Sequence, residues 1–263
     1  MADITLKRDG NDLEFNKIKG TDTVMMHKRK RTYYKTISGV RIPGDKKRSP
    51  LESYIRCDTD LSHYHDVIDI PTTVFHHGFD YPVVALEAEL MLQATAVTQV
   101  SIPGTVEKIP YCAFLHCTNL KTVILNEGIK ILDDYAFSGC PFIHDIVLPD
   151  SIVQLTNQVF LDCENLTTVT LGENLKLLGA ENFQSCSNIT SVTCKAEIPP
   201  TCINPIQFTS WVYDNAVLKV SQFSIDKYRN APGWSQFKNI EPMYVGRGPN
   251  DHPQWTKNDY ISD

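Results

Sequence analysis

The chain has 263 residues, of which 42% are hydrophobic and 21% charged, so it is long enough for one or two domains with a buried core. Its longest apolar stretch, residues 83–97, contains Glu87 and Glu89, which argues against a membrane-spanning helix, and the first eight residues lack the apolar core of a signal peptide. The net charge of −6 is unevenly divided, because residues 1–56 hold 14 Lys or Arg against 7 Asp or Glu, and the remainder holds 11 against 24.

Residues 1–56 are therefore predicted to be a basic N-terminal arm with a net charge of +7, ahead of a body with a net charge of −13. Basic runs with neighbouring aromatic residues such as Tyr33 and Tyr34 can contact nucleic acid or an acidic protein surface, and they also occur as solvated leaders. We expect an acidic protein partner rather than nucleic acid, and a solvated arm is the open alternative. The basic residues concerned are Lys28, Arg29, Lys30, Arg31, Lys46, Lys47 and Arg48.

Four histidines lie between residues 63 and 77: His63, His65, His76 and His77. Residues two apart on a strand face the same side, so such histidines could share a metal ion. Exposed loop histidines are common, however, and neither a Cys-x-x-Cys pair nor a Cys/His cluster at zinc spacing occurs in the chain. We predict no metal site and no cofactor.

The dominant feature of residues 77–194 is an internal repeat with a step of 23 residues, which is typical of leucine-rich repeats. The two clearest columns are Phe114, Phe137, Phe160 and Phe183, and Cys117, Cys140, Cys163 and Cys186. One step earlier, the pattern weakens to Leu86, Met91, Ala94 and Val97, which indicates a degenerate first rung. The segment is thus predicted to hold about five rungs, and a single rung cannot bury its apolar face alone.

Each rung is predicted to contain one strand and a return segment. In residues 120–125, alternation directs Val123 and Leu125 inward and Ile124 outward. The return segments have apolar spacings of three to five residues, which suit irregular or short helical turns. The predicted fold is a mainly β repeat solenoid in which the Phe column forms an inner spine.

The chain has 8 cysteines, and half of them belong to the repeat. Cysteines that share one position in successive rungs are expected to be small buried apolar groups. Cys112 with Cys117, or Cys194 with Cys202, could form disulfides under oxidation, but reduced thiols are the simpler expectation.

The outward side chains of the strands are the predicted binding surface, because the sheet face of a solenoid is where such proteins commonly bind. Small hydroxyl residues with an apolar pair, Ile124 and Val147, suit a protein or glycan better than a deep small-molecule pocket. Strand propensity of Thr and Val is the alternative explanation of the pattern. The predicted face comprises Gln99, Ser101, Lys121, Thr122, Ile124, His144, Asp145, Val147, Thr168, Thr170, Ser191 and Thr193.

No catalytic residues are predicted. The chain lacks a glycine-rich phosphate loop and a Gly-x-Ser-x-Gly elbow. The paired carboxylates Asp133 and Asp134 fall on a return segment, where we expect solvated surface charges rather than an acid/base pair.

The repeat unit Ala113-Phe114-x-x-Cys117-x-x-Leu120-x-x-Val123-x-Leu125 resembles the BspA-like leucine-rich repeat, with the best match over residues 100–194. More loosely, residues 67–83 resemble the β-hairpin that opens such arrays, which implies an N-terminal cap at 57–76. Residues 198–237 resemble the closing segment, which implies a mixed C-terminal cap at 195–245, followed by an extended tail at 246–263.

This resemblance implies a non-enzymatic module for recognition of proteins or surfaces, since relatives are typically secreted bacterial proteins with adhesion or binding roles, and others occur in parasites and bacteriophage. Without a leader, an intracellular or virion-associated location is favoured over secretion. The alternative is a structural assembly component, such as a virion decoration or fibre-associated protein, whose basic arm and tail contact neighbouring subunits.

Overall fold

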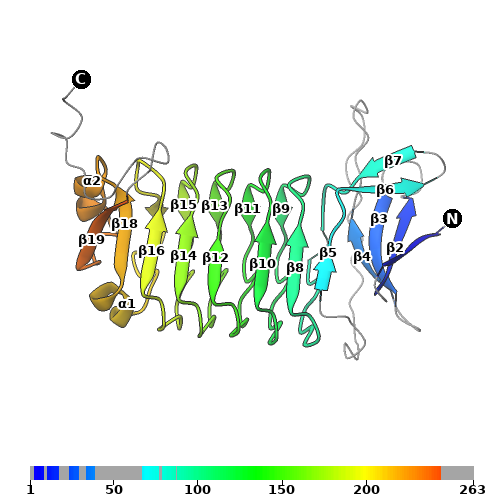
Figure 1. The fold of residues 1–263 in the computed structure, drawn as a ribbon, viewed down its shortest axis with the longest axis horizontal. Helices are drawn as coiled ribbons and strands as arrows, with labels where there is room; N and C mark the ends of the chain where they lie inside the picture. The colour runs from blue at the N-terminus through cyan, green and yellow to red at the C-terminus, as the bar shows by residue number, and fades with distance from the viewer. Residues whose placement is uncertain are drawn as a thin grey trace, which may run out of the picture.

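The computed structural model describes residues 3–8, 11–17, 24–29, 34–38, 67–76, 79–86 and 88–243. Its main body is a right-to-left row of stacked rungs in which a front and a back strand alternate along the chain (Figure 1). The predicted mainly β solenoid is confirmed. The front strands of the repeats are β8 (Gln99–Ile102), β10 (Thr122–Leu125), β12 (Asp145–Val147), β14 (Thr168–Leu171) and β16 (Ser191–Cys194).

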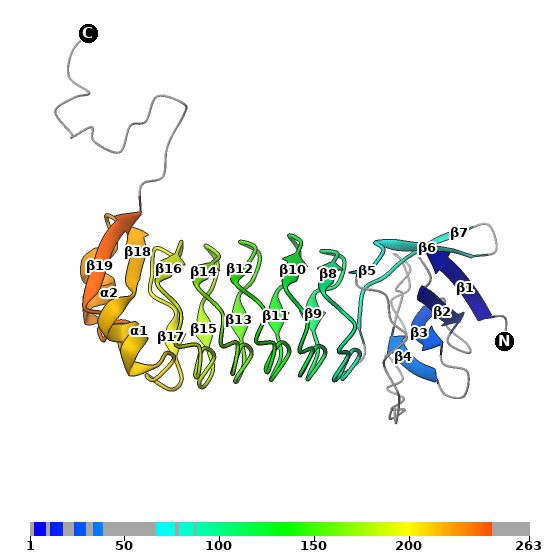
Figure 2. The same ribbon diagram turned by 60° about the horizontal axis from the view of Figure 1, so that its bottom comes forward.

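The return segments contain more regular structure than their spacing predicts. Each includes a two-residue strand, and these strands form a second parallel sheet behind the first, as Figure 2 shows. In Ile131–Leu132, for example, Leu132 is buried and Ile131 half-buried. Two residues are too short for alternation to be visible in the sequence. The back strands are β9 (Lys108–Ile109), β11 (Ile131–Leu132), β13 (Gln154–Leu155), β15 (Leu177–Leu178) and β17 (Thr201–Cys202).

Stacked aromatic rings run through the core. Neighbouring rings of the four repeat phenylalanines have centroids 5.1, 5.6 and 5.6 Å apart and lie within 6° of parallel. Phe208 adds a fifth ring 4.9 Å from Phe183. It follows Phe183 by 25 residues, so a search at a step of 23 does not find it. All five side chains are at most 1% exposed.

Two positions in each rung have left-handed backbone conformation. Their φ angles lie between 53° and 66°, and Gly139 is the one glycine among them. For other residues this conformation costs about 1 to 2 kcal/mol. It directs the amide toward the following rung: Cys112 donates to Asp134 O (3.0 Å), and His116 donates to Ser138 O (2.8 Å). The positions are 89, 112, 135, 158 and 181, and 93, 116, 139, 162 and 185.

Residues 3–38 include a four-stranded antiparallel sheet in the order β1-β2-β3-β4. The predicted basic arm thus contains strands that its charge does not reveal. Arg8 pairs with Asn11, and the intervening Asp9-Gly10 is a dipeptide typical of two-residue hairpins, a signal that the search for charge overlooked. The strands are β1 (Asp3–Arg8), β2 (Asn11–Lys17), β3 (Val24–Arg29) and β4 (Tyr34–Ser38).

The opening of the solenoid differs in detail from the predicted cap. The hairpin consists of β6 (Thr73–His76) and β7 (Phe79–Pro82), so it crosses the predicted boundary at residue 76. The preceding segment, β5 (Val67–Asp69), is a parallel strand paired with β8 rather than part of the hairpin. Because β5 pairs with β8, it extends the front sheet by one strand.

The closing segment continues the solenoid before it ends. Strands β18 (Val217–Ser221) and β19 (Asn239–Met243) extend the front sheet, and helices α1 (Ser210–Asn215) and α2 (Ile225–Asn230) precede each of them. Trp234 is 1% exposed and its indole Nε1 donates to Pro200 O (2.8 Å). Buried aromatic residues therefore cover the last rung, as a solenoid cap must.

Replacing Phe160 by Ala tests the ring stack. Phe160 lies between Phe137 and Phe183, at 5.6 Å from each, and its side chain is 0% exposed. We expect the Phe160→Ala substitution to lower the free energy of unfolding by about 3 to 5 kcal/mol because it leaves a cavity. Urea denaturation measures the change, with exposed Thr118→Ala as the control. Equal losses in the two variants would contradict the packing described here.

Candidate binding face

The predicted face is formed by the outward side chains of the front strands. Parallel pairing in register places residues 23 apart beside each other, such as Asp145 beside Thr168 and Val147 beside Thr170. Ile124 and Val147 remain 42% and 60% exposed. Of the other members of the face, the exposed ones are Lys121, Thr122, His144, Asp145 and Thr168, and the half-buried ones are Gln99, Ser101, Thr170, Ser191 and Thr193.

Polar groups within the face bind one another. The carboxylate of Asp145 accepts hydrogen bonds from the hydroxyl of Thr168 and, at 3.3 Å, from that of Thr167. The threonine hydroxyls thereby hold the carboxylate in one orientation on the surface. Asp145 can still accept hydrogen bonds from a ligand, since it is an exposed residue.

The face extends beyond the residues that were predicted. Thr193 pairs with Lys219 in β18, and Lys219 pairs with Glu241 in β19. Both charged residues are exposed and belong to the outward column that contains Ile124 and Val147. The alternation in residues 217–221 could have identified Lys219, but the spacing from Thr193 is 26 rather than 23, so the repeat does not align it.

The basic residues and the histidine group are not assembled into a site among the described residues. Lys28 and Arg29 lie in β3, and His76 lies in β6. The remaining predicted basic residues and histidines lie outside the described residues: Lys30, Arg31, Lys46, Lys47, Arg48, His63, His65 and His77.

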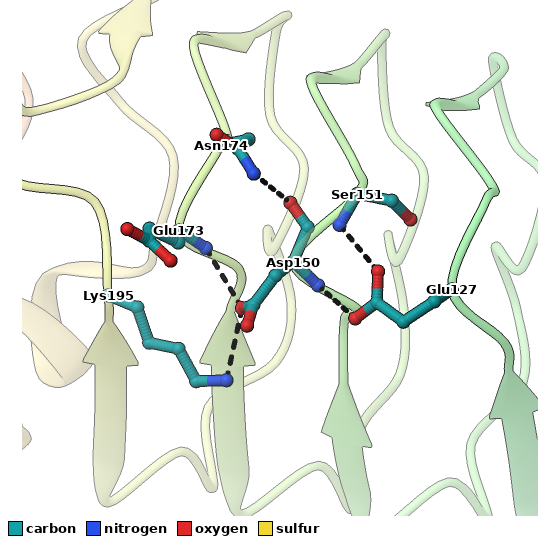
Figure 3. Close-up of polar contacts among 6 residues, drawn as sticks. All are labelled: Glu127, Asp150, Ser151, Glu173, Asn174 and Lys195. Atoms are coloured by element: carbon teal, nitrogen blue, oxygen red, sulfur yellow. Dashed lines mark hydrogen bonds and ion pairs between the residues drawn. The ribbon is translucent and has the colours of Figure 1, made fainter.

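Carboxylates on the turns after the front strands bind the main chain of the following rung (Figure 3). Glu127 accepts from the amides of Asp150 (2.8 Å) and Ser151 (2.9 Å). One rung later, Asp150 accepts from the amide of Glu173 (3.1 Å) and from Lys195 Nζ (3.0 Å). These carboxylates therefore link rungs, and their spacing follows the repeat.

The pKa of Asp150 is lowered by these contacts. Partial burial disfavours its charged form, but the hydrogen bonds from Lys195 and the Glu173 amide, together with the lysine charge, outweigh that effect. A carboxyl whose pKa is lower in the folded state stabilises the fold above its unfolded pKa, and this stabilisation disappears as the pH falls through the folded pKa.

The Asp150→Ala substitution should lower the free energy of unfolding by roughly 0.5 to 1.5 kcal/mol at pH 7, a range reduced by the solvent exposure of the ion pair. The difference from the original chain should shrink below about pH 4, where Asp150 becomes protonated. Denaturation at several pH values measures it, with Glu173→Ala as a control that retains the Glu173 amide. A difference that grows at low pH would contradict this assignment.

Asp133 and Asp134 are half-buried and structural rather than simply solvated, as the sequence had indicated. Asp134 Oδ1 accepts from the Asn157 amide (2.7 Å), and Asp133 forms an ion pair with Lys108 (2.7 Å). Their positions on the return segment bring them against adjacent rungs, which a single rung of sequence does not show.

The cysteines of the repeat are buried thiols. Cys163 Sγ donates to Phe137 O (3.4 Å), and Cys186 Sγ donates to Phe160 O (3.1 Å). Burial raises the pKa of the Cys163 thiol well above its ordinary value, and it raises the pKa of Cys194 to about 11 and that of Cys202 to about 12. All seven described cysteines are free, including the two pairs that might have formed disulfides. High pKa and burial make them poor nucleophiles.

Thiol labelling at pH 8 tests this description. In a Cys57→Ser background, we expect none of the seven described thiols to react with Ellman's reagent within minutes, because burial blocks access and thiolate is scarce. All seven should react after denaturation in guanidinium. Rapid labelling of two or more thiols in the folded chain would show that the cysteine column is accessible.

Two further properties concern the described residues. Within them, no group of three or more His, Cys, Asp or Glu is placed to hold a metal ion. Neither helix there combines the length and apolar character required to cross a lipid bilayer.

Parallel rungs with a 23-residue step, an inner apolar spine and an outward sheet face define a leucine-rich-repeat protein. Residues 89–205 match the BspA type Leucine rich repeat region in 6 copies, and this part of the chain belongs to that family. The resemblance seen in the repeat motif is confirmed. Proteins of this family act as protein-interaction or surface modules, which is the coarse functional class that the match supports.

Solved structures show the same fold. A leucine-rich repeat protein from Bacteroides ovatus is 19% identical, with 90% of this chain and 52% of that chain covered and a TM-score of 0.52. For the pneumococcal vaccine antigen PcpA, the identity is 15%, the coverage 84% and 51%, and the TM-score 0.51. The chain thus spans about half the length of each. No curated protein matches its sequence.

Proposed function

We propose that the chain is a non-enzymatic recognition module that presents the front face of its solenoid to a protein or a glycan-bearing surface. The observation that carries the proposal is the exposure of Ile124 and Val147, at 42% and 60%, in the middle of a face of hydroxyl and charged side chains. An apolar centre with a polar rim is the usual arrangement of a protein-binding surface.

The remainder of the described solenoid supports this assignment by its lack of competing roles. Carboxylates on the turns bind the main chain, and the repeat cysteines are buried. The outward columns, by contrast, can vary without disturbing the core, because they contribute little to the packing between rungs. Thr168 and Asp145 supply donors and acceptors beside the apolar pair, which suits hydrogen bonding to a partner main chain or to sugar hydroxyls.

Substitution of the apolar pair tests the proposal. Binding partners are first identified by screening the whole chain against arrayed surface proteins and glycans, and the affinity of each is then measured for Ile124→Asp and Val147→Asp. Because a charge would be placed at the centre of the interface, we expect at least about tenfold weaker binding.

Ile203→Asp is the matched control, since Ile203 is 66% exposed but follows the back strand β17. Its affinity should remain that of the original chain. Melting temperatures of all three variants establish that each is folded. If both front-face variants retain full affinity for every partner found, the front face is not the binding surface.

A further inference from the structure

The front face is divided into two sheets. Strands β5, β8 and β10 form one, and β12, β14, β16, β18 and β19 form the other, whereas the back sheet runs unbroken from β9 to β17. Figures 1 and 2 both show β10 and β12 farther apart than the other neighbouring front strands. We call the junction between β10 and β12 the seam. Within the described residues, no hydrogen bond joins 121–125 to 144–148.

The first cause of the seam lies just before β12. Two residues after each repeat cysteine, an asparagine normally donates to a main-chain carbonyl of the preceding rung. These bonds are Asn119 to Thr95 O (2.6 Å), Asn165 to Pro141 O (2.8 Å) and Asn188 to Glu164 O (2.8 Å). Phe142 occupies the equivalent position at the seam, and it is 43% exposed. A phenyl ring cannot donate this bond.

The second cause lies just after β12. At the end of the neighbouring front strands, Asn126 donates its amide to Ile102 O (3.1 Å), and Lys195 donates to Leu171 O (3.1 Å). The equivalent residue at the seam is Pro149, which has no N–H to donate. Strand β12 thus lacks the customary bond to β10 at both of its ends.

Main-chain groups within the two strands are left facing the seam. Successive residues of a strand direct their amides to opposite sides. Leu148 donates to Thr170 O of β14 (2.8 Å), so the amide of Val147 points toward β10. Asn126 donates to β8, so the amide of Leu125 points toward β12. The core beneath is also less covered, since Val123 is half-buried whereas its counterparts Val100, Ile146, Val169 and Val192 are at most 1% exposed.

Other contacts hold the same two rungs together away from the front face. In the back sheet, Leu132 pairs with Leu155, and in the core the rings of Phe114 and Phe137 are 5.1 Å apart. At the turn, the Glu127 carboxylate accepts two amides of the next rung. The back and the corners of the junction are therefore closed, and only its front is open.

We propose that the seam is a hinge within the front face, about which the two blocks of rungs tilt while the back sheet remains paired. Ile124 lies on one side of the hinge and Val147 on the other, so a tilt changes the spacing of the apolar pair. The role of this motion in recognition rests on the proposed function: the face adjusts its width to its partner. The hinge itself depends only on the missing front-face bonds.

Hydrogen exchange of the full chain without a ligand tests the hinge. After correction for intrinsic rates, the amides of Leu125 and Val147 should exchange at least about 100-fold faster than those of Thr170 and Thr193, the counterparts of Val147 at paired junctions. This difference is expected because unpaired amides at an open junction exchange without unfolding of the rung. Equal protection at the seam and at these paired junctions would overturn the proposal.

A second measurement uses the double variant Phe142→Asn with Pro149→Asn, which places at the seam the residues found at positions 119 and 126. Closure of the seam should slow exchange at Val147 at least about tenfold. Single substitutions at exposed Thr118 and Thr190 serve as controls. No slowing in a double variant that retains its melting temperature would show that the two residues do not cause the seam.

The same double variant separates the hinge from the binding face. Its affinity for a partner found by the front-face experiment should change by at least about threefold, because a closed seam fixes the spacing of Ile124 and Val147. Unchanged affinity would overturn the role of the hinge in recognition. Loss of binding in Ile124→Asp would still stand, so the two proposals fail independently.

Discussion

Main-chain hydrogen bonds between groups 22 to 24 residues apart are the interaction on which this structure depends. Examples are Lys121 N to Thr98 O at 2.8 Å on the front and Thr156 N to Leu132 O at 3.0 Å on the back. Strands joined in this way lie about 4.8 Å apart. Each side chain must therefore pack against the side chain one repeat before it. Identical residues satisfy this requirement, which is why phenylalanine stacks on phenylalanine and cysteine follows cysteine.

The same spacing assigns the polar residues their tasks. Turn carboxylates such as Glu127 and Asp150 recur at one step because each lies opposite the amides of the next rung. Left-handed residues recur because their amides must reach the following carbonyls, and the bonds formed compensate the conformational cost. Among the surfaces of the solenoid, the outward front columns have the fewest such obligations, and there the sequence is free to meet a partner.

Local departures from the repeat are where the structure acquires individual properties. Phe142 and Pro149 replace donors that other rungs provide, and the front sheet divides at that junction. Phe208 departs from the step but retains the stack, because the chain compensates for two extra residues before the ring. The first departure alters the face on which we place binding, and the second allows the core to meet the closing cap without an exposed end.

The sequence by itself determined the repeat, the inward Phe and Cys columns, and the outward columns, because each depends on alternation and a fixed step that are visible along one chain. It could not determine the back strands, the links made by Asp134 and Asp150, the inclusion of Lys219 in the face, or the seam. These depend on which residues of separate rungs meet, and on donors that are missing rather than present. Stacking in three dimensions decides such pairings, since a hydrogen bond requires both partners at about 3 Å.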